Sequence, residues 1–246
     1  MKAMIFAAGL GTRLKPITDT MPKALVPVCG QPLLYHVITK LVAAGYDDLV
    51  VNVHHFPDQI IHYLHSHDFG ARISVSDERD FLRETGGGIR FAKHLLTGEE
   101  PFLVHNVDIV SNLDLPWLRE QHRPEALATL VVSERKTQRY FLFDGDNRLR
   151  GWSNIATGEV RSPFPDIDPD RCRKLAFAGI HLISPAIFDA FDRYGFGDRF
   201  SIVDFYLRAC ADYPVYAAVP PDFRLVDVGK KETLSEAERV CETILR

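Results

Sequence analysis

The chain has 246 residues, 46% of them hydrophobic and 25% charged, and a formal net charge of −4, which is an ordinary composition for a globular protein. The acidic balance gives no support for a nucleic-acid partner, and we find neither a signal-peptide pattern nor an apolar run of membrane-spanning length. The four cysteines are scattered, without a Cys-x-x-Cys pair, and we interpret them as reduced, buried thiols of a cytoplasmic protein.

Short apolar runs alternate with helical patterns over the first part of the chain, and several runs are rich in β-branched residues. We expect strands at residues 2–6, 48–53, 72–76, 101–106 and 126–132. We expect helices between them, at residues 31–45, 56–70 and 85–96. Strands separated by helices predict a parallel sheet, in which ligands bind beyond the carboxyl ends of the strands.

After about residue 135 the pattern changes. We expect a hairpin at 139–152 around Asp-Gly-Asp-Asn, a loop at 162–170, a strand at 175–183 and a helix at 201–211. No repeat, low-complexity tract or linker divides the chain. We therefore expect one domain over residues 1–246, in which the second half, 136–246, closes over the first, 1–135, to form a pocket.

The loop "AAGLGTRLKPITDTMPKALVPV", residues 7–28, follows the first predicted strand. Gly9 and Gly11 permit positive φ and close backbone approach, and Arg13 and Lys23 bring positive charge to the same loop. Neither familiar phosphate-loop pattern fits, because the third glycine of the dinucleotide fingerprint and the Gly-Lys-Ser of the Walker loop are absent. An ordinary glycine-rich connection is the alternative. The two cations favour a loop that holds a polyanion such as a nucleotide phosphate chain.

Two aspartates stand at the ends of apolar runs. Asp108 follows "PFLVHNV" and Asp227 lies in "FRLVDVGKKETL". Each alone is more often a cap or turn residue. Paired across a cleft that faces a phosphate loop, they predict a Mg²⁺ site, because Mg²⁺ prefers one or two carboxylates together with phosphate oxygens and water. We expect folding to survive the loss of either charge, which would relieve repulsion between the two.

Several interrupted motifs, spread over almost the whole chain, match one known family. They are "AAGLGTRLKP…MPKALVPV", "ETGGG" at 84–88, "HNVD" at 105–108, "FAGI" at 177–180 and "VDVGKKETL" at 226–234. Together they resemble the signature of the sugar-1-phosphate nucleotidyltransferases, enzymes that convert an NTP and a sugar 1-phosphate into an NDP-sugar and pyrophosphate. The resemblance implies an α/β fold with a Rossmann-like mixed, mostly parallel sheet flanked by helices, like that of GT-A enzymes.

The resemblance also implies roles for single residues. In the nucleotide-binding half, 1–135, it assigns the NTP to Ala7, Ala8, Gly9, Gly11, Thr12, Arg13, Lys23, Thr85, Gly86, Gly87 and Asn106. In the sugar-binding half, 136–246, it places Ala178 and Gly179 beneath the sugar. It assigns the Mg²⁺ cofactor to Asp108 and Asp227, the second of which comes from the sugar-binding half.

The implied chemistry needs no protein nucleophile, because the sugar phosphate oxygen is already anionic near neutral pH. That oxygen attacks the α-phosphorus in line and expels pyrophosphate. Catalysis is then positioning and charge neutralisation, with Arg13 and Lys23 as the catalytic residues beside Mg²⁺. Arg13 is expected at the β- and γ-phosphates and Lys23 at the α-phosphate.

The motifs also bear on the choice of substrates. "Ala-Ala-Gly" at 7–9 resembles pyrimidine-using members, and "ETGGGI" at 84–89 resembles the N-acetylmuramate-1-phosphate uridylyltransferases of cell-wall recycling. "HNVD" departs from the commoner Asn-Gly-Asp. We therefore expect UTP and N-acetylmuramate 1-phosphate, and no nucleic-acid or membrane partner. Guanylyl transfer to heptose or mannose 1-phosphate, cytidylyl transfer to choline phosphate, and a non-catalytic sugar-nucleotide sensor are the alternatives.

Overall fold

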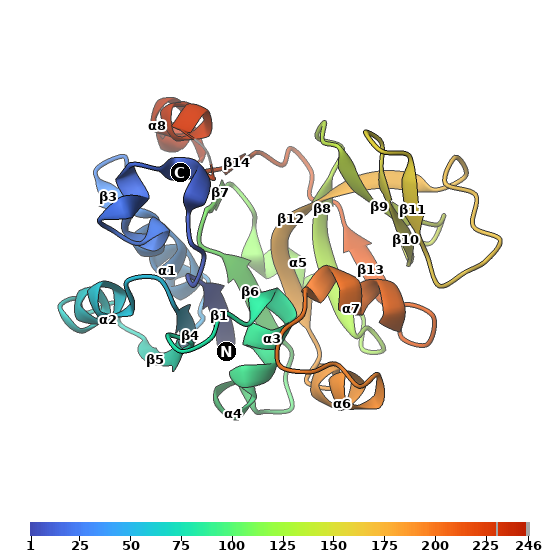
Figure 1. Ribbon diagram of the computed structural model, residues 1–246, viewed down its shortest axis with the longest axis horizontal. Coiled ribbons are helices and arrows are strands. Elements are labelled where there is room, and N and C mark those ends of the chain that lie inside the picture. The colour runs from blue at the N-terminus through green and yellow to red at the C-terminus, as the bar shows by residue number, and fades with distance from the viewer. Residues whose placement is uncertain (230, 245–246) are drawn as a thin grey trace.

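The computed structural model describes residues 1–229 and 231–244, including the side chains of 1–229 and 233–239. Its centre is a ten-stranded sheet (Figure 1). The strands of this sheet are β1 (Lys2–Phe6), β4 (Asp48–Val53), β5 (Arg72–Asp77), β6 (Phe102–Asn106), β8 (Ala128–Ser133), β9 (Arg139–Phe143), β10 (Leu149–Asn154), β11 (Glu159–Arg161), β12 (Arg173–Ile183) and β13 (Val215–Ala218). Two ribbons stand beside it, β2 (Pro27–Val28) with β3 (Gln31–Pro32), and β7 (Ile109–Ser111) with β14 (Leu225–Asp227).

The strand order is β11-β10-β9-β12-β6-β1-β4-β5, and β8 pairs with both β12 and β13. The pairs β4–β5, β1–β4 and β1–β6 are parallel, whereas β12 runs antiparallel to β6, β8 and β9. The sheet is therefore mixed, as predicted. One continuous sheet runs through both halves of the chain, and the division at residue 135 falls in the loop between β8 and β9.

Helices cover both faces of the sheet. One face packs against α1 (Leu33–Ala43), α2 (Pro57–His65) and α5 (Leu115–Glu120), and the other against α3 (Glu84–Phe91), α4 (Lys93–Leu96), α6 (Ile187–Arg193) and α7 (Ile202–Ala209). The last helix, α8 (Lys231–Ile244), packs against β2, β7 and β14. Over the described residues, no helix is both long and apolar enough to cross a membrane.

The predicted elements are confirmed, with differences in two helices. The helix expected at 56–70 ends at His65, and the one expected at 85–96 is divided. That segment forms two helices, α3 and α4, which meet at Ala92. The predicted hairpin is the antiparallel pair β9–β10. The short strands β7 and β14 were not predicted, because runs of three residues carry too little periodicity to be distinguished from loop.

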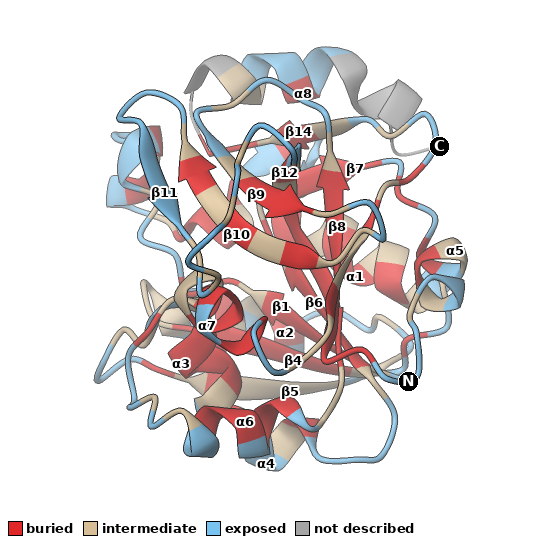
Figure 2. Cartoon of the chain, turned by 90° about the vertical axis from the view of Figure 1, so that its right-hand side faces the viewer, coloured by how far each residue is buried: buried red, intermediate tan, exposed pale blue. Residues whose placement is uncertain are grey.

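The core follows the two-residue period of the strands. In β1, Ala3 and Ile5 belong to the cluster under α1 and α2, whereas Met4 belongs to the cluster under α3 and α7. Buried residues accordingly concentrate on the sheet and on the inner faces of the helices (Figure 2). Such a two-sided core fixes the carboxyl ends of β1, β4, β5 and β6 next to one another.

The prediction of four reduced, buried thiols is wrong for two of the cysteines. Cys29 is half-buried and disulfide-bonded, and Cys172 is a half-buried free thiol. Cys210 is free and buried, and burial raises its pKa to about 12. The side chain of Cys241 lies outside the described residues. Wide spacing along the sequence says nothing about distance in the fold, which is why the bonded cysteine escaped sequence reasoning.

Glycine in α3 allows the helix to touch a neighbouring backbone. A Cβ on Gly87 would lie 2.3 Å from the carbonyl oxygen of Asp198. Gly87→Ala should therefore lower the free energy of unfolding by about 1–3 kcal/mol through overpacking, even though alanine favours a helix over glycine by up to about 1 kcal/mol. Urea unfolding checks this, with Gly145→Ala as the control, because a Cβ on Gly145 meets nothing within 4 Å. Equal stability of the two variants would contradict the close packing.

Candidate active site

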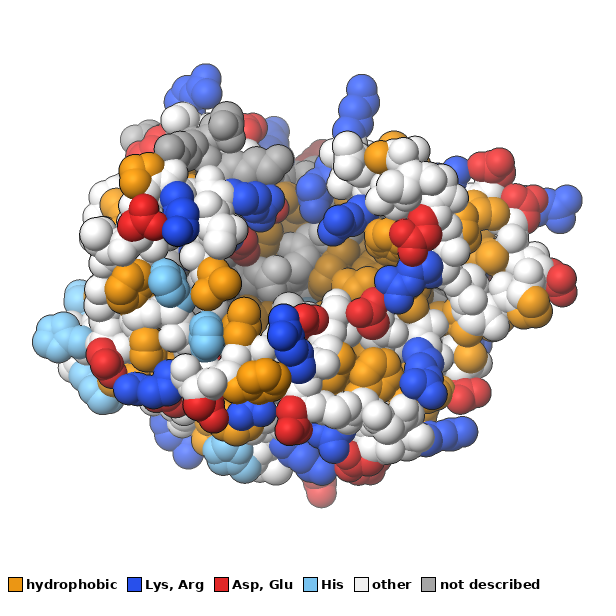
Figure 3. Space-filling view, in the orientation of Figure 1, with side chains coloured by type: hydrophobic (Ala, Val, Ile, Leu, Met, Phe, Trp, Pro, Cys, Tyr) orange, Lys and Arg blue, Asp and Glu red, His pale blue; other side chains and the backbone are white. Residues whose placement is uncertain are grey.

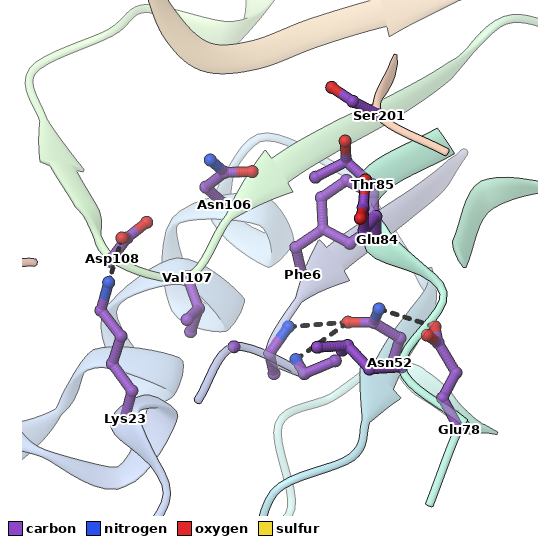
Figure 4. Close-up of a pocket in the computed structure, with 14 residues that line it drawn as sticks. Phe6, Lys23, Asn52, Glu78, Glu84, Thr85, Asn106, Val107, Asp108 and Ser201 are labelled. Carbon is purple, nitrogen blue, oxygen red and sulfur yellow. Dashed lines mark hydrogen bonds and ion pairs between the residues drawn. The ribbon is translucent and has the colours of Figure 1, made fainter. Parts of the chain in front are cut away.

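A cavity of about 410 Å³ opens at the carboxyl ends of β1, β4, β5 and β6 (Figure 4). The loop after β1, the start of α3 and the segment after β6 therefore come together at one edge of the sheet. The cavity is lined by seven of the residues assigned from the sequence, namely Ala7, Ala8, Gly9, Lys23, Thr85, Asn106 and Asp108. Phe6, Asn52, Glu78, Leu82, Glu84, Val107 and Ser201 also line it.

The other assigned residues lie away from this cavity. Arg13 and Asp227 line a second cavity of about 690 Å³. Neither cavity is lined by Gly11, Thr12, Gly86, Gly87, Ala178 or Gly179, all of which are described residues. That these six contact a substrate stays a prediction, and the structure gives four of them packing roles.

Gly11 turns the loop after β1 back on itself. Its φ is +62°, and a Cβ there would lie 2.7 Å from the Cγ2 of Thr18. The hydroxyl of Thr18 donates to the carbonyl of Gly11 over 2.8 Å. Glycine is therefore required both by the left-handed backbone and by the close side chain.

A buried polar pair holds the start of this loop. The side-chain oxygen of Asn52 accepts hydrogen bonds from the backbone N–H groups of Ala7, at 2.8 Å, and Ala8, at 3.3 Å. The Asn52 amide nitrogen donates to Glu78 over 2.8 Å, and Figure 4 shows Asn52 between the loop and Glu78. Glu78 is fully buried, and this burial raises the pKa of its carboxyl. Because the two N–H groups are already bonded, any contact between this loop and the NTP falls to other atoms of the loop.

Sequence reasoning missed Asn52 and Glu78. The only available signal was a polar residue at each strand end, Asn52 within "DLVVNV" and Glu78 after "RISVSD".

The N-terminus of α3 docks against the loop before α7. The N–H groups of Gly86 and Gly87 donate to the carbonyl of Phe200, at 2.9 and 3.2 Å. A Cβ on Gly86 would lie 2.2 Å from the Phe200 ring. Thr85 accepts from the N–H of Ile202 over 2.9 Å and turns toward the cavity. The glycines thus bring Thr85 to the cavity wall.

A bulge in β12 makes room for Asn106. The register of β12 against β8 shifts between Phe177 and His181, and Gly179 within this bulge has a φ of +72°. A Cβ on Gly179 would lie 2.5 Å from the side-chain nitrogen of Asn106. Gly179 thus allows β12 to pack against the side chain of Asn106 on the cavity wall.

The unpredicted ribbon β7–β14 brings the two aspartates together. Asp227 pairs with Ile109, and the N–H of Val228 donates to the carbonyl of Asp108 over 2.8 Å. The ammonium of Lys23, which is only 8% exposed, forms an ion pair with Asp108. On the other strand, one carboxylate oxygen of Asp227 is buried without a hydrogen-bond partner.

These two aspartates fit a Mg²⁺ ion. A buried carboxylate oxygen without a partner is costly unless a cation or donor reaches it. Among the described residues, no group of three or more histidine, cysteine or acidic side chains could hold a metal. The aspartate pair alone could do so for Mg²⁺, which takes its remaining ligands from phosphates and water.

Asp108 lines the first cavity and Asp227 lines the second, and the β7–β14 ribbon holds these two residues on adjacent chains. A Cβ on Gly229 would lie 2.7 Å both from the Arg13 guanidinium and from the unpartnered oxygen of Asp227, so Arg13 passes close to this carboxylate. The far wall comes from the β8–β9 loop and β9, with Arg135, Lys136 and Arg139. Figure 3 shows the hollow face of the molecule, with Lys and Arg side chains on both sides of its upper rim. Sequence reasoning singled out none of the three cations of the far wall.

Comparison with known proteins shows which family the chain belongs to. The nucleotidyl transferase family model matches residues 2–143. The chain is 34% identical to N-acetylmuramate alpha-1-phosphate uridylyltransferase of Caulobacter vibrioides, over 96% of this chain and 95% of that protein. It is 33% identical to the mannose-1-phosphate guanylyltransferase catalytic subunit beta of Danio rerio, over 60% of this chain and 42% of that one.

A solved structure shares the fold. HddC from Yersinia pseudotuberculosis, also solved in complex with GMP-PN, superposes with a TM-score of 0.78 at 21% identity, over 97% of this chain and 98% of that one. The match to the family model covers more than half of the chain, and the Caulobacter relative is similar along nearly its whole length. The chain therefore belongs to the sugar-1-phosphate nucleotidyltransferases.

Proposed function

We propose that the protein transfers the uridylyl group of UTP to N-acetylmuramate 1-phosphate, giving a UDP-sugar and pyrophosphate, in the recycling of cell-wall sugars. The observation that carries the transfer chemistry is the pair Asp108–Asp227, which lies beside Lys23 and contributes one carboxylate to the lining of each cavity. The relative of this name that matches almost end to end supports the choice of substrates. Both substrates are cytoplasmic metabolites, so we place the reaction in the cytoplasm.

The two cavities give each substrate a place. We assign the nucleotide to the cavity at the carboxyl ends of β1, β4, β5 and β6, where Asn106 and Thr85 offer polar side chains. We assign the sugar 1-phosphate to the second cavity, whose cations face Asp227. The phosphorus under attack then lies at the aspartate pair.

Charge neutralisation and positioning carry the reaction. The sugar phosphate oxygen is already anionic, so its attack on the α-phosphorus needs no proton transfer. Asp108 and Asp227 would hold a Mg²⁺ ion, which supplies charge neutralisation of the phosphate oxygens. Lys23 lies at the same carboxylate as this cation site, so its ammonium can turn from Asp108 to the α-phosphate. Arg13 approaches from the opposite side and stabilises leaving phosphate oxygens.

Guanylyl transfer to a neutral sugar 1-phosphate is the second candidate. The observation that favours it is the similarity to a mannose-1-phosphate guanylyltransferase.

A substrate panel decides between the candidates. Pyrophosphate release is measured with Mg²⁺, each NTP in turn and a set of sugar 1-phosphates. We expect UTP with N-acetylmuramate 1-phosphate to give the highest kcat/KM. Faster release with GTP and mannose 1-phosphate would replace the first candidate by the second. The absence of release with every pair would favour a non-catalytic sensor.

The same substitution at the two aspartates should affect activity alike and stability differently. Asp108→Asn and Asp227→Asn should each lower kcat by at least about a hundredfold. Asp108→Asn also leaves the buried ammonium of Lys23 without its partner and should lower the free energy of unfolding by about 1–3 kcal/mol. Asp227→Asn removes a carboxylate with an unpartnered buried oxygen and should keep or raise stability.

Steady-state kinetics and urea unfolding on both variants check this pair of outcomes. The ion pair with Lys23 revises the expectation that loss of either charge relieves repulsion, because Asp108 is already neutralised. Near-normal turnover of either variant at saturating Mg²⁺ would remove that aspartate from the site.

Substitutions of Arg13 and Lys23 should change different kinetic constants. Arg13→Ala should raise KM for the nucleotide and lower kcat, whereas Lys23→Ala should mainly lower kcat. In the reverse reaction, Arg13→Ala should weaken the binding of pyrophosphate more than the binding of UDP-sugar. The reason is that UDP-sugar has no γ-phosphate and its β-phosphate belongs to the sugar. Reverse-reaction kinetics measure both. Since Arg13 lines the second cavity, a larger effect on UDP-sugar would assign it to the sugar phosphate instead.

A further inference from the structure

The second cavity is unusually basic for this protein. Its lining contains four cationic side chains, Arg13, Arg135, Lys136 and Arg139, against the single carboxylate of Asp227. The whole chain carries a net charge of −4. The cavity is thus basic although the whole chain is acidic, and this local positive charge favours an anionic ligand.

The cations of the far wall are not neutralised by the protein. Among the described residues, neither Lys136 nor Arg139 forms an ion pair. Arg135 donates to the carbonyl of Phe177 over 2.9 Å, which fastens the β8–β9 loop to β12. The acidic neighbour Glu134 faces Arg173 instead, at 3.7 Å. Lys136 of the loop and Arg139 at the start of β9 therefore line the cavity without an ion pair to any described residue.

One phosphate does not account for these charges. The 1-phosphate must reach the aspartate pair to react, so it lies at the part of the cavity that Asp227 lines. Lys136 and Arg139 line the same cavity from the β8–β9 loop and the start of β9. Hydroxyl groups of a neutral sugar are usually bound by neutral or acidic polar groups, of which this wall offers Thr137 and Gln138. A second acidic group on the sugar would accept charge-assisted hydrogen bonds from Lys136 and Arg139.

We propose that Lys136 and Arg139 make the enzyme selective for a sugar 1-phosphate that carries a carboxylate, with the guanidinium of Arg139 and the ammonium of Lys136 binding that carboxylate. The proposal rests on the proposed function and deepens it, because N-acetylmuramate 1-phosphate has such a carboxylate and mannose 1-phosphate has none. Trp152, an aromatic side chain of the same cavity that is partly exposed, would contact the apolar face of the sugar ring.

The test compares sugar 1-phosphates in pairs that differ in acidic groups. One pair is N-acetylmuramate 1-phosphate with N-acetylglucosamine 1-phosphate, and the other is glucuronate 1-phosphate with glucose 1-phosphate. Each is assayed with the NTP that gives the fastest pyrophosphate release. We expect the wild-type protein to prefer the acidic member by about tenfold to a hundredfold in kcat/KM, the size of a charge-assisted hydrogen bond.

Substitutions then locate the preference. Lys136→Ala with Arg139→Ala should reduce the acidic-to-neutral ratio at least about tenfold, and Lys136→Glu with Arg139→Glu should reverse it. Arg171→Ala is the control, because this exposed arginine lies outside both cavities and its loss changes the net charge by the same amount per residue. It should leave the ratio unchanged. A variant that merely folds less well has a lower kcat/KM for both sugar 1-phosphates of a pair. A change in their ratio therefore reports on recognition of the carboxylate.

Three results would overturn the proposal. The first is a higher kcat/KM of the wild-type protein for the neutral sugar 1-phosphates. The second is an acidic-to-neutral ratio of kcat/KM that the double variants leave unchanged, and the third is a double variant whose KM rises for the NTP and not for the sugar 1-phosphate. In each of these the transfer reaction itself still runs, so the proposed function stands. No pyrophosphate release with any pair would overturn the proposed function and this inference together.

Discussion

The pairing of β7 with β14 is the constraint on which the site depends. These two short strands place Asp108 and Asp227, far apart in the sequence, on adjacent chains. Without that ribbon, the first aspartate would end a strand of the nucleotide half and the second would precede α8 with nothing to join them. Each cavity is lined by one of these aspartates, so the ribbon also ties the wall of one cavity to the wall of the other.

Buried polar groups around the cavity are arranged before any substrate arrives. Asn52 and Glu78 fix the N–H groups of Ala7 and Ala8, and the carbonyl of Phe200 fixes those of Gly86 and Gly87. Each of these bonds satisfies a donor that would otherwise be costly inside the protein. The loops that face the cavity are therefore held by side chains and carbonyls behind them, and little ordering remains for binding to supply.

Much of this could be predicted from the sequence. The strands and helices follow from apolar periodicity, and the carboxyl edge of the parallel strands identifies where Lys23, Thr85 and Asp108 gather. What escaped prediction has a common cause. The Asn52–Glu78 pair, the β7–β14 ribbon, the disulfide at Cys29 and the basic loop before β9 all depend on contacts between distant segments. Local pattern carries no information about such contacts, and single polar residues at strand ends are too common to stand out.

The long strand β12 has a mechanical consequence. It pairs with β6 through Ile180–Ile183, with β8 through Ala176–Ile183, and with β9 through Arg173–Leu175, so one strand belongs to both halves at once. A hinge between two rigid lobes would have to break backbone hydrogen bonds in the middle of the sheet. Any closing motion around the substrates must then come from the surface loops, such as the one between β8 and β9, while the floor of the cleft keeps its shape through the catalytic cycle.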